Sequence, residues 1–268
     1  MTSTKAGLAP DVTTGSPERF GYSWQAFADL SPGQFEQFRR WTALLRPEDW
    51  RGKTFLDVGC GGGRNSRWAL DFGAAGGTAI DVNEGSLSIA HRRFADDRRV
   101  EVAFVSAYDI PWRDRFDIVF SIGVVHHLQD PTLALQRMVQ AAKPGGQVLV
   151  WLYGRENNGF VVHVFDPLRR VVFARLPLGL TRKLAFIPAT ALWVGLRLGL
   201  GRIAYYRMLR RFPFRHLHHI IFDHMIPRIA RYYRRDEAEA LLRNAGLQNV
   251  RLDWVNEMSW TAVGTKPG

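Results

Sequence analysis

A run of glycines directly after an apolar segment has the residue types and spacing needed to hold a small ligand. The stretch Thr54–Arg64 reads TFLDVGCGGGR, in which the apolar run Phe55–Val58 is followed by Gly59–Gly63. Glycines allow a tight turn and a close approach of the backbone to a ligand, because no Cβ is in the way. A helix that begins after such a turn presents unpaired N–H groups and its positive end. The pattern predicts a strand, a ligand-binding turn and a helix over Asn65–Phe72.

An acidic residue at the end of the next predicted strand narrows the kind of ligand. Asp81 closes the strand Thr78–Val82, where a carboxylate can accept hydrogen bonds from both hydroxyls of a ribose. The dinucleotide fingerprint G-x-G-x-x-G would need a glycine at position 64, and the chain has Arg64 there. These residues indicate an adenosine-containing ligand and argue against a nicotinamide-dependent oxidoreductase.

Two adjacent histidines follow another predicted strand. His126 and His127 come shortly after Phe116–Ser121, and ligands of open α/β sheets bind beyond the carboxyl ends of the strands. Histidine is the side chain best suited to act as a base near neutral pH. The alternative is that both are structural histidines with no part in chemistry.

The segment Phe55–Gly63 resembles the first motif of class I S-adenosylmethionine (SAM) dependent methyltransferases, hydrophobic-hydrophobic-Asp-x-Gly-x-Gly-x-Gly. Further segments in the same order resemble other parts of these enzymes, and the whole is most similar to methyltransferases of type 11. The resemblance covers Lys53–Tyr153 and Arg235–Pro267, about half the chain. It implies SAM as the cofactor.

The resemblance also implies which residues hold the cofactor. Ser106 departs from the family pattern, in which an aspartate is usual, and a neutral hydroxyl is a weaker partner for the adenine amine. The cofactor-binding residues that it implies are Asp57, Gly59, Gly61, Asp81, Val82, Ser106, Ala107 and Ile122.

Residues for catalysis and acceptor binding are expected around the same edge. His126 is the first candidate base and Glu156 the second, and no metal site is predicted. An N-terminal segment could serve as a lid over the cofactor or as plain packing. The candidates for contact with the methyl acceptor are Tyr22, Trp24, Tyr153 and Arg155.

The fold expected from these elements is α/β. It is a Rossmann-like, seven-stranded, mostly parallel sheet with an antiparallel C-terminal edge, an N-terminal helical lid and a helical insert. Residues 1–19 are predicted to be a disordered tail, 20–158 and 235–268 the methyltransferase domain, and 159–234 a basic, apolar helical cap. Strands are predicted over 100–105, 147–153, 248–255 and 259–265, and helices over 84–95, 131–142 and 235–244.

The net charge of +11 is concentrated in one region. Trp151–Arg235 contains sixteen arginines and lysines but three acids, whereas the rest of the chain has slightly more acids than bases. Three explanations stay open: a helical cap with solvated arginines, a cap that docks on an anionic membrane surface, or a nucleic-acid-binding surface. Leu184–Tyr206 is long enough to span a bilayer, but its arginines and proline argue against a transmembrane helix.

The expected function is SAM-dependent methyl transfer to a small-molecule or lipid-linked acceptor by in-line displacement. The alternatives are methyl transfer to RNA and a SAM-binding interaction protein without turnover. A single cysteine, Cys60, permits no intramolecular disulfide and fits a reducing compartment. We therefore expect a cytoplasmic protein, peripheral on the inner face of the membrane if the cap docks there.

Overall fold

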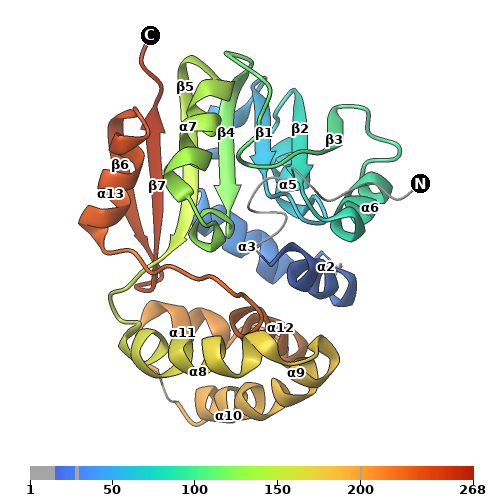
Figure 1. The fold of residues 1–268 in the computed structure, drawn as a ribbon, viewed down its shortest axis with the longest axis vertical. Coiled ribbons are helices and arrows are strands. Elements are labelled where there is room, and N and C mark those ends of the chain that lie inside the picture. The colour runs from blue at the N-terminus through green and yellow to red at the C-terminus, as the bar shows by residue number, and fades with distance from the viewer. Residues whose placement is uncertain (1–15, 28–29, 200) are drawn as a thin grey trace.

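A seven-stranded sheet forms the centre of the computed structural model, which describes residues 16–27, 30–199 and 201–268 (Figure 1). The strand order is β3-β2-β1-β4-β5-β7-β6. Five strands are parallel, and β7 runs antiparallel to both β5 and β6. This confirms the predicted fold. The strands are β1 (Thr54–Val58), β2 (Gly76–Asp81), β3 (Val100–Phe104), β4 (Phe116–Ile122), β5 (Ala142–Tyr153), β6 (Gln248–Val255) and β7 (Ser259–Thr265).

Helices cover both faces of the sheet because each presents an apolar stripe to it. On one face, α7 and α13 bury side chains such as Leu135, Met138 and Leu242 against the sheet. On the other face, α3, α5 and α6 bury Phe38, Trp68 and others. These helices are α3 (Pro32–Trp41), α5 (Arg64–Asp71), α6 (Glu84–Arg93), α7 (Pro131–Ala141) and α13 (Arg235–Asn244), and the short α4 (Pro47–Trp50) precedes β1.

Two predicted boundaries differ from the structure by more than two residues. Helix α2 (Pro17–Ala26) includes the last three residues of the predicted tail, and residues 1–15 lie outside the described part of the chain. Strand β5 begins at Ala142, directly after α7, although a loop was expected up to Gly146. Gly145 adopts a φ of +75°, so the glycine that suggested a stop lets the strand bulge and continue.

The chain between β5 and α13 forms a layer of helices beyond the carboxyl ends of the parallel strands (Figure 1). Among the described residues, no helix is both long enough and apolar enough to cross a membrane. The apolar run Leu184–Tyr206 instead contributes to separate helices. The insert contains η2 (Val161–Phe165), α8 (Asp166–Val171), η3 (Phe173–Arg175), α9 (Leu178–Leu184), α10 (Phe186–Arg197), α11 (Ala204–Leu209) and α12 (Phe214–Met225).

Buried arginines tie the insert together and attach it to α2. Arg169 is fully buried, pairs with Asp166 on the same helix and donates to the carbonyl of Pro227. From α2, the Arg19 Nε atom donates to the carbonyl of Ile226 at 2.7 Å. A buried charge is tolerated only when it is paired and hydrogen-bonded. The burial of Arg169 and of Arg19 therefore depends on these carboxylate and carbonyl partners.

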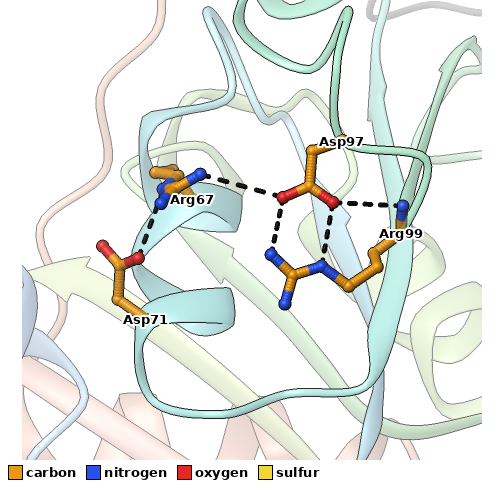
Figure 2. A network of polar contacts seen from close by, with 4 residues as sticks. All are labelled: Arg67, Asp71, Asp97 and Arg99. Carbon is orange, nitrogen blue, oxygen red and sulfur yellow. Dashed lines mark hydrogen bonds and ion pairs between the residues drawn. The ribbon is translucent and has the colours of Figure 1, made fainter.

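A second ion-pair network lies on the surface of the sheet domain, and its arginines are much more exposed than Arg169 and Arg19. Asp97 accepts from Arg99 at 2.6 Å and lies 3.8 Å from Arg67, which in turn pairs with Asp71 (Figure 2). The arginines in this network are about half exposed. Pairs of this kind contribute little to stability, because water screens them and ordering their side chains costs entropy.

Replacing the aspartate of each network by asparagine is expected to lower the free energy of unfolding by different amounts. Asp166→Asn leaves the buried Arg169 without its counter-charge, so we expect the free energy of unfolding to fall by about 3–5 kcal/mol. Asp97→Asn should lower it by about 0–1 kcal/mol. Urea unfolding of both variants measures this, and equal losses would contradict the structural role of Asp166.

Candidate functional site

The glycine turn after β1 is held in place by Asp81 at the end of β2. Gly59 and Gly61 adopt positive φ angles of +77° and +53°. The N–H of Gly61 donates to Asp81 Oδ2 at 2.9 Å, and the N–H of Asn83 donates to Oδ1 at 2.9 Å. A carboxylate has about four lone-pair sites, so it can accept from more than two donors. Asp81 thus fixes the turn and also faces the cavity beside it.

The turn is covered by Trp24 of α2. A Cβ placed on Gly61 would come within 2.1 Å of the Trp24 indole, and the ring also lies near Gly62. Glycine at position 61 is therefore needed both for its backbone conformation and for the close approach of this ring. Trp24 therefore packs directly over the turn.

Asp57 lies beneath the turn and does not line the cavity. It is fully buried and accepts a hydrogen bond from the Ser66 hydroxyl at 2.6 Å. Burial disfavours the charged carboxylate and raises the pKa of Asp57 to about 7, and the nearby Asp81 adds to this. Asp57 supports the turn from below, in place of the direct ligand contact that its motif position suggested.

Arg64, the residue that breaks the dinucleotide fingerprint, points into the same cavity. Its Nε and Nη1 atoms are buried and have no hydrogen-bond partner among the described residues. Its guanidinium lies 4.6 Å from the centre of the Trp24 ring. Burial lowers the pKa of Arg64 to about 10, so it is charged at neutral pH. Buried unpaired donors of a cation form a site for an anionic group.

A cavity of about 480 Å³ runs from the turn into the insert. Its cofactor side contains Gly59, Asp81 and Val82, and its far side is formed by α11 and α12. Ten aromatic side chains lie along its wall, and such rings are common in sites that bind planar groups. They are Phe20, Trp24, Trp41, Trp151, Tyr153, Phe160, Phe165, Tyr205, Tyr206 and Tyr232.

Five of the predicted cofactor residues line this cavity, and so do two of the predicted acceptor contacts, Trp24 and Tyr153. Gly61 lies under Trp24 instead. The Ser106 hydroxyl accepts from the N–H of Tyr108 at 3.0 Å and is buried outside the cavity wall. The five cofactor residues that line it are Gly59, Asp81, Val82, Ala107 and Ile122.

The structure does not favour either predicted base. His126 is fully buried behind the cavity wall, with both ring nitrogens unpartnered among the described residues and its ring 3.9 Å from that of Tyr153. Burial lowers the pKa of His126 well below the usual value, so its cation is disfavoured. Glu156 lies outside the cavity, where it accepts from the N–H of Arg235 at the start of α13 and from the indole of Trp260.

Two predicted acceptor contacts also lie elsewhere. Tyr22 packs against the Phe222 ring in the core shared by α2 and the insert, with Arg182 over its ring. Arg155 has its backbone N–H bonded to the carbonyl of Tyr233. Neither belongs to the cavity wall as the structure describes it.

Polar residues of α12 face the cavity, although they are not among the residues predicted from the sequence. His219 pairs with Asp223 at 3.0 Å, and Asp223 accepts from the Ser23 hydroxyl of α2 at 2.5 Å. The spacing of four between the two α12 residues is a signal in the sequence, since it places both on one helix face. Which face meets the cavity depends on how the insert packs.

Comparison with known proteins identifies the central part of the chain. Residues 56–150 match a family model described as a methyltransferase domain. This stretch contains the glycine turn, Asp81, the whole of β2, β3 and β4, and most of β1 and β5. Residues 56–150 therefore belong to a methyltransferase domain.

Relatives share this methyltransferase domain and little beyond it. The phosphoethanolamine N-methyltransferase 2 of Caenorhabditis elegans is 32% identical over 139 residues, which cover 50% of this chain and 31% of that protein. A ubiquinone biosynthesis O-methyltransferase of Pseudomonas paraeruginosa is 34% identical over 118 residues, covering 42% and 50%. The chain thus spans half or less of the length of these relatives.

The fold is also found among solved structures. A 1,6-didemethyltoxoflavin-N1-methyltransferase of Burkholderia thailandensis has a TM-score of 0.57 at 16% identity, covering 99% of this chain and 94% of the other. At this identity the likeness concerns the fold of the methyltransferase.

The cavity residues of this methyltransferase domain fit SAM. Asp81 can accept from the ribose hydroxyls, and Val82 can pack on the adenine. Arg64 offers two buried, unpaired donors to the carboxylate of the methionine part. The turn at Gly59 leaves its backbone accessible from the cavity.

The raised pKa of Asp57 predicts a pH-dependent stability. Between about pH 4 and pH 7 the folded domain binds a proton that the unfolded chain has lost, so the contribution of Asp57 to stability falls as pH rises. The difference in free energy of unfolding between wild type and Asp57→Asn should therefore decrease by on the order of 4 kcal/mol across this range. Denaturant unfolding at several pH values measures it.

Asp117 provides a control, because its pKa is lowered whereas that of Asp57 is raised. Although its partial burial favours the neutral form, hydrogen bonds from Thr54 and Lys143 outweigh that effect and lower the pKa of Asp117 to about 2. Its contribution is lost only below about pH 4, so the Asp117→Asn difference should stay constant from about pH 4 to pH 8. If the difference in free energy of unfolding between wild type and Asp57→Asn also stays constant over this range, the pKa of Asp57 is not raised and the prediction is wrong.

Proposed function

We propose that this protein transfers the methyl group of SAM to an apolar, ring-bearing small molecule held under the helical insert. The observation that carries the proposal is the continuity of the cavity from Gly59 and Asp81 to the aromatic side chains of the insert. An acceptor placed among these rings would lie next to the bound cofactor.

The composition of the cavity wall supports a planar, weakly polar acceptor. Tyr153 stacks with Tyr232 and with His224, so these rings already form a layered surface. Ring stacking favours aromatic ligands beyond the gain from apolar burial alone. The names of two relatives indicate methylation of small molecules, one in ubiquinone biosynthesis and one of phosphoethanolamine. For this chain, the aromatic wall favours an acceptor of the first kind.

The protein's contribution to catalysis would be placement and exclusion of water. SAM supplies an electrophilic methyl group on a positively charged sulfur. Asp81 and Arg64 hold the two ends of the cofactor, and Trp24 closes over the turn. Correct orientation of the two reactants can supply about 7–11 kcal/mol of the barrier. The insert keeps the cavity apolar, and an apolar site favours a reaction in which charge disappears.

The outer surface of the insert supports docking on an anionic membrane, from which a lipid-linked acceptor could enter. Most of the large apolar side chains that the described part of the chain exposes lie on η2 and α8–α10 or directly after α10. The sequence has eleven arginines and lysines and no acid between Asp166 and Asp223. Exposed apolar groups flanked by cations are what interfacial helices use. The exposed apolar residues are Phe160, Val164, Leu168, Val171, Val172, Leu180, Phe186, Ile187, Val194 and Leu198.

A nucleic-acid acceptor is less well supported. Binding of single strands needs aromatic rings that are free to stack on bases. In the basic run of α11, Tyr205 and Tyr206 pack in a small core with the buried Phe212. These rings are occupied within the insert. Methylation of RNA, or SAM binding without methyl transfer, would contradict the proposal.

Label transfer tests the reaction. With methyl-labelled SAM and a lysate split into lipid, small-molecule and RNA fractions, we expect label in the lipid fraction with wild-type protein. Asp81→Asn removes charge-assisted hydrogen bonds worth about 1.5–3 kcal/mol each, so SAM affinity should fall about 10- to 100-fold. Calorimetric titration with SAM measures that loss separately. Label in RNA would refute the acceptor class, and SAM binding without label would refute turnover.

Vesicle sedimentation tests the membrane surface. Wild-type protein should bind phosphatidylglycerol vesicles and bind phosphatidylcholine vesicles much less, with affinity falling as salt rises. Val171 and Ile187 are more than 60% exposed and lie outside the cavity wall. Because a buried apolar side chain contributes about 1.5–3 kcal/mol, the double change to serine should weaken binding at least about tenfold. Phe104→Ser, at an exposed position on β3, should leave it unchanged; equal loss in both would contradict the proposal.

A further inference from the structure

A carboxylate and an imidazole meet inside the cavity at a place that no methyltransferase motif marks. His219 Nε2 lies 3.0 Å from Asp223 Oδ2, four residues further along α12. The other oxygen of Asp223 accepts from the Ser23 hydroxyl at 2.5 Å. All three side chains line the cavity. Asp223 therefore orients the imidazole, and α2 in turn orients Asp223.

His219 differs from the other three histidines of the cavity wall. His127 bonds to the carbonyl of Ile229 and His224 to that of Ile220, whereas His216 bonds to the amide of Gln37. Burial lowers the pKa of His127 and of His216 to about 4, so both resist protonation. Of the histidines that line the cavity in the described structure, His219 alone is paired with a carboxylate. A carboxylate partner stabilises the imidazolium that forms when histidine accepts a proton.

The second ring nitrogen of His219 is the one available to a ligand. Nε2 faces Asp223, and Nδ1 has no hydrogen-bond partner within the described part of the chain. The imidazole stacks on the Phe27 ring with centres 4.2 Å apart, which fixes its plane. A hydrogen on Nε2 donated to Asp223 leaves the lone pair of Nδ1 free to accept a proton.

The pair is close to the cofactor side of the cavity. Ser23, which binds Asp223, directly precedes Trp24, and Trp24 covers the glycine turn and Arg64. Asp223 is near enough to Arg64 to favour the charged form of the guanidinium. An acceptor between the pair and the turn would therefore meet both the base and the methyl donor.

We propose that His219, held by Asp223, is the base that removes the proton from a ring hydroxyl as that oxygen is methylated. This inference rests on the proposed methyl transfer and adds the acceptor atom and the residue that activates it. The hydroxyl proton moves to Nδ1 of His219, and its oxygen forms a bond to the methyl carbon. The carbon–sulfur bond breaks with its electron pair returning to sulfur, which becomes the neutral thioether of S-adenosylhomocysteine. Charge and atoms balance without a further reactant.

The charged and titratable groups around His219 are few. Asp223, His216, His218 and His224 share its helix, with the His216 ring centre 6.4 Å from that of His219 and His218 close enough to interact with it electrostatically. Ser23 and Phe27 face it from the α2 segment, and Arg64 lies on the cofactor side. Asp223 is ionised at neutral pH, because attraction to His219 and hydrogen bonds outweigh the burial that would raise its pKa.

Ionisation of a bound chromogenic ring tests the proton transfer without turnover. The probe is an alkylated nitrocatechol, whose visible absorbance reports loss of its phenolic proton, and binding is followed by quenching of cavity tryptophans. We expect the ring bound to wild-type protein to ionise at a pH about one unit or more below that of the ring bound to His219→Gln. Equal ionisation in the two complexes overturns the proposal, as does a wild-type protein that does not bind the ring.

Turnover of the same probe provides the second readout. With SAM present, His219→Gln should lose about 100-fold or more in kcat, with a smaller change in KM and loss of the acid limb of the pH profile. Asp223→Asn should show the same pattern with a smaller loss. His218→Gln is the matched control on α12, because His218 bonds to the carbonyl of Arg182 outside the cavity; its kcat should match wild type.

Failure of this inference can be distinguished from failure of the proposed function. Absence of SAM binding and of label transfer in wild-type protein would refute methyl transfer itself. Label transfer that His219→Gln leaves intact, at an unchanged melting temperature, would refute the base alone. Label found on an amine nitrogen would refute the hydroxyl acceptor.

Discussion

The hydrogen bond from the Gly61 N–H to the Asp81 carboxylate is the contact on which the site depends. It closes the turn after β1 against the end of β2, and the parallel pairing of these strands brings both ends to the same edge of the sheet. Asp57 and Ser66 support the turn from below. Because Gly61 has a positive φ and almost no room for a side chain, this part of the site is determined largely by the backbone.

Helix α2 joins the glycine turn after β1 to the insert. One of its residues covers the turn, a second binds Asp223, and a third, Arg19, donates to carbonyl groups of the insert at Ile226 and Phe173. A single short helix therefore contacts both the cofactor side and the acceptor side of the cavity. Because Ser23 and Trp24 are adjacent on this helix, the contact with Asp223 and the cover over the turn depend on the same placement of α2.

The positive charge of the chain has two different roles in the structure. Arg169 and Arg19 are buried, and they satisfy carbonyl groups where helices of the insert meet. Others, such as Arg170, stay largely exposed even where they pair with an acid, here Asp166 at 2.7 Å. Burial of a guanidinium requires fixed partners, whereas an exposed guanidinium remains hydrated and gains little from its pair. Composition alone cannot separate these roles, because both use the same residue type.

The sequence by itself determined the sheet and the cofactor side of the site. The apolar runs, the glycines after β1 and the acid at Asp81 are local signals, because strand propensity and turn geometry depend on neighbouring residues. For this reason α13, β6 and β7 were predicted at their observed bounds.

Only the tertiary structure decided which side chains face the acceptor. It placed His126 behind the wall and Glu156 at the start of α13, and it brought Ser23 of α2 to Asp223, 200 residues away. The insert has no motif, and its apolar residues serve equally for a core, a cavity wall or a docking surface. Their roles follow from how the helices pack against α2 and the sheet, which is a long-range outcome that local patterns do not encode.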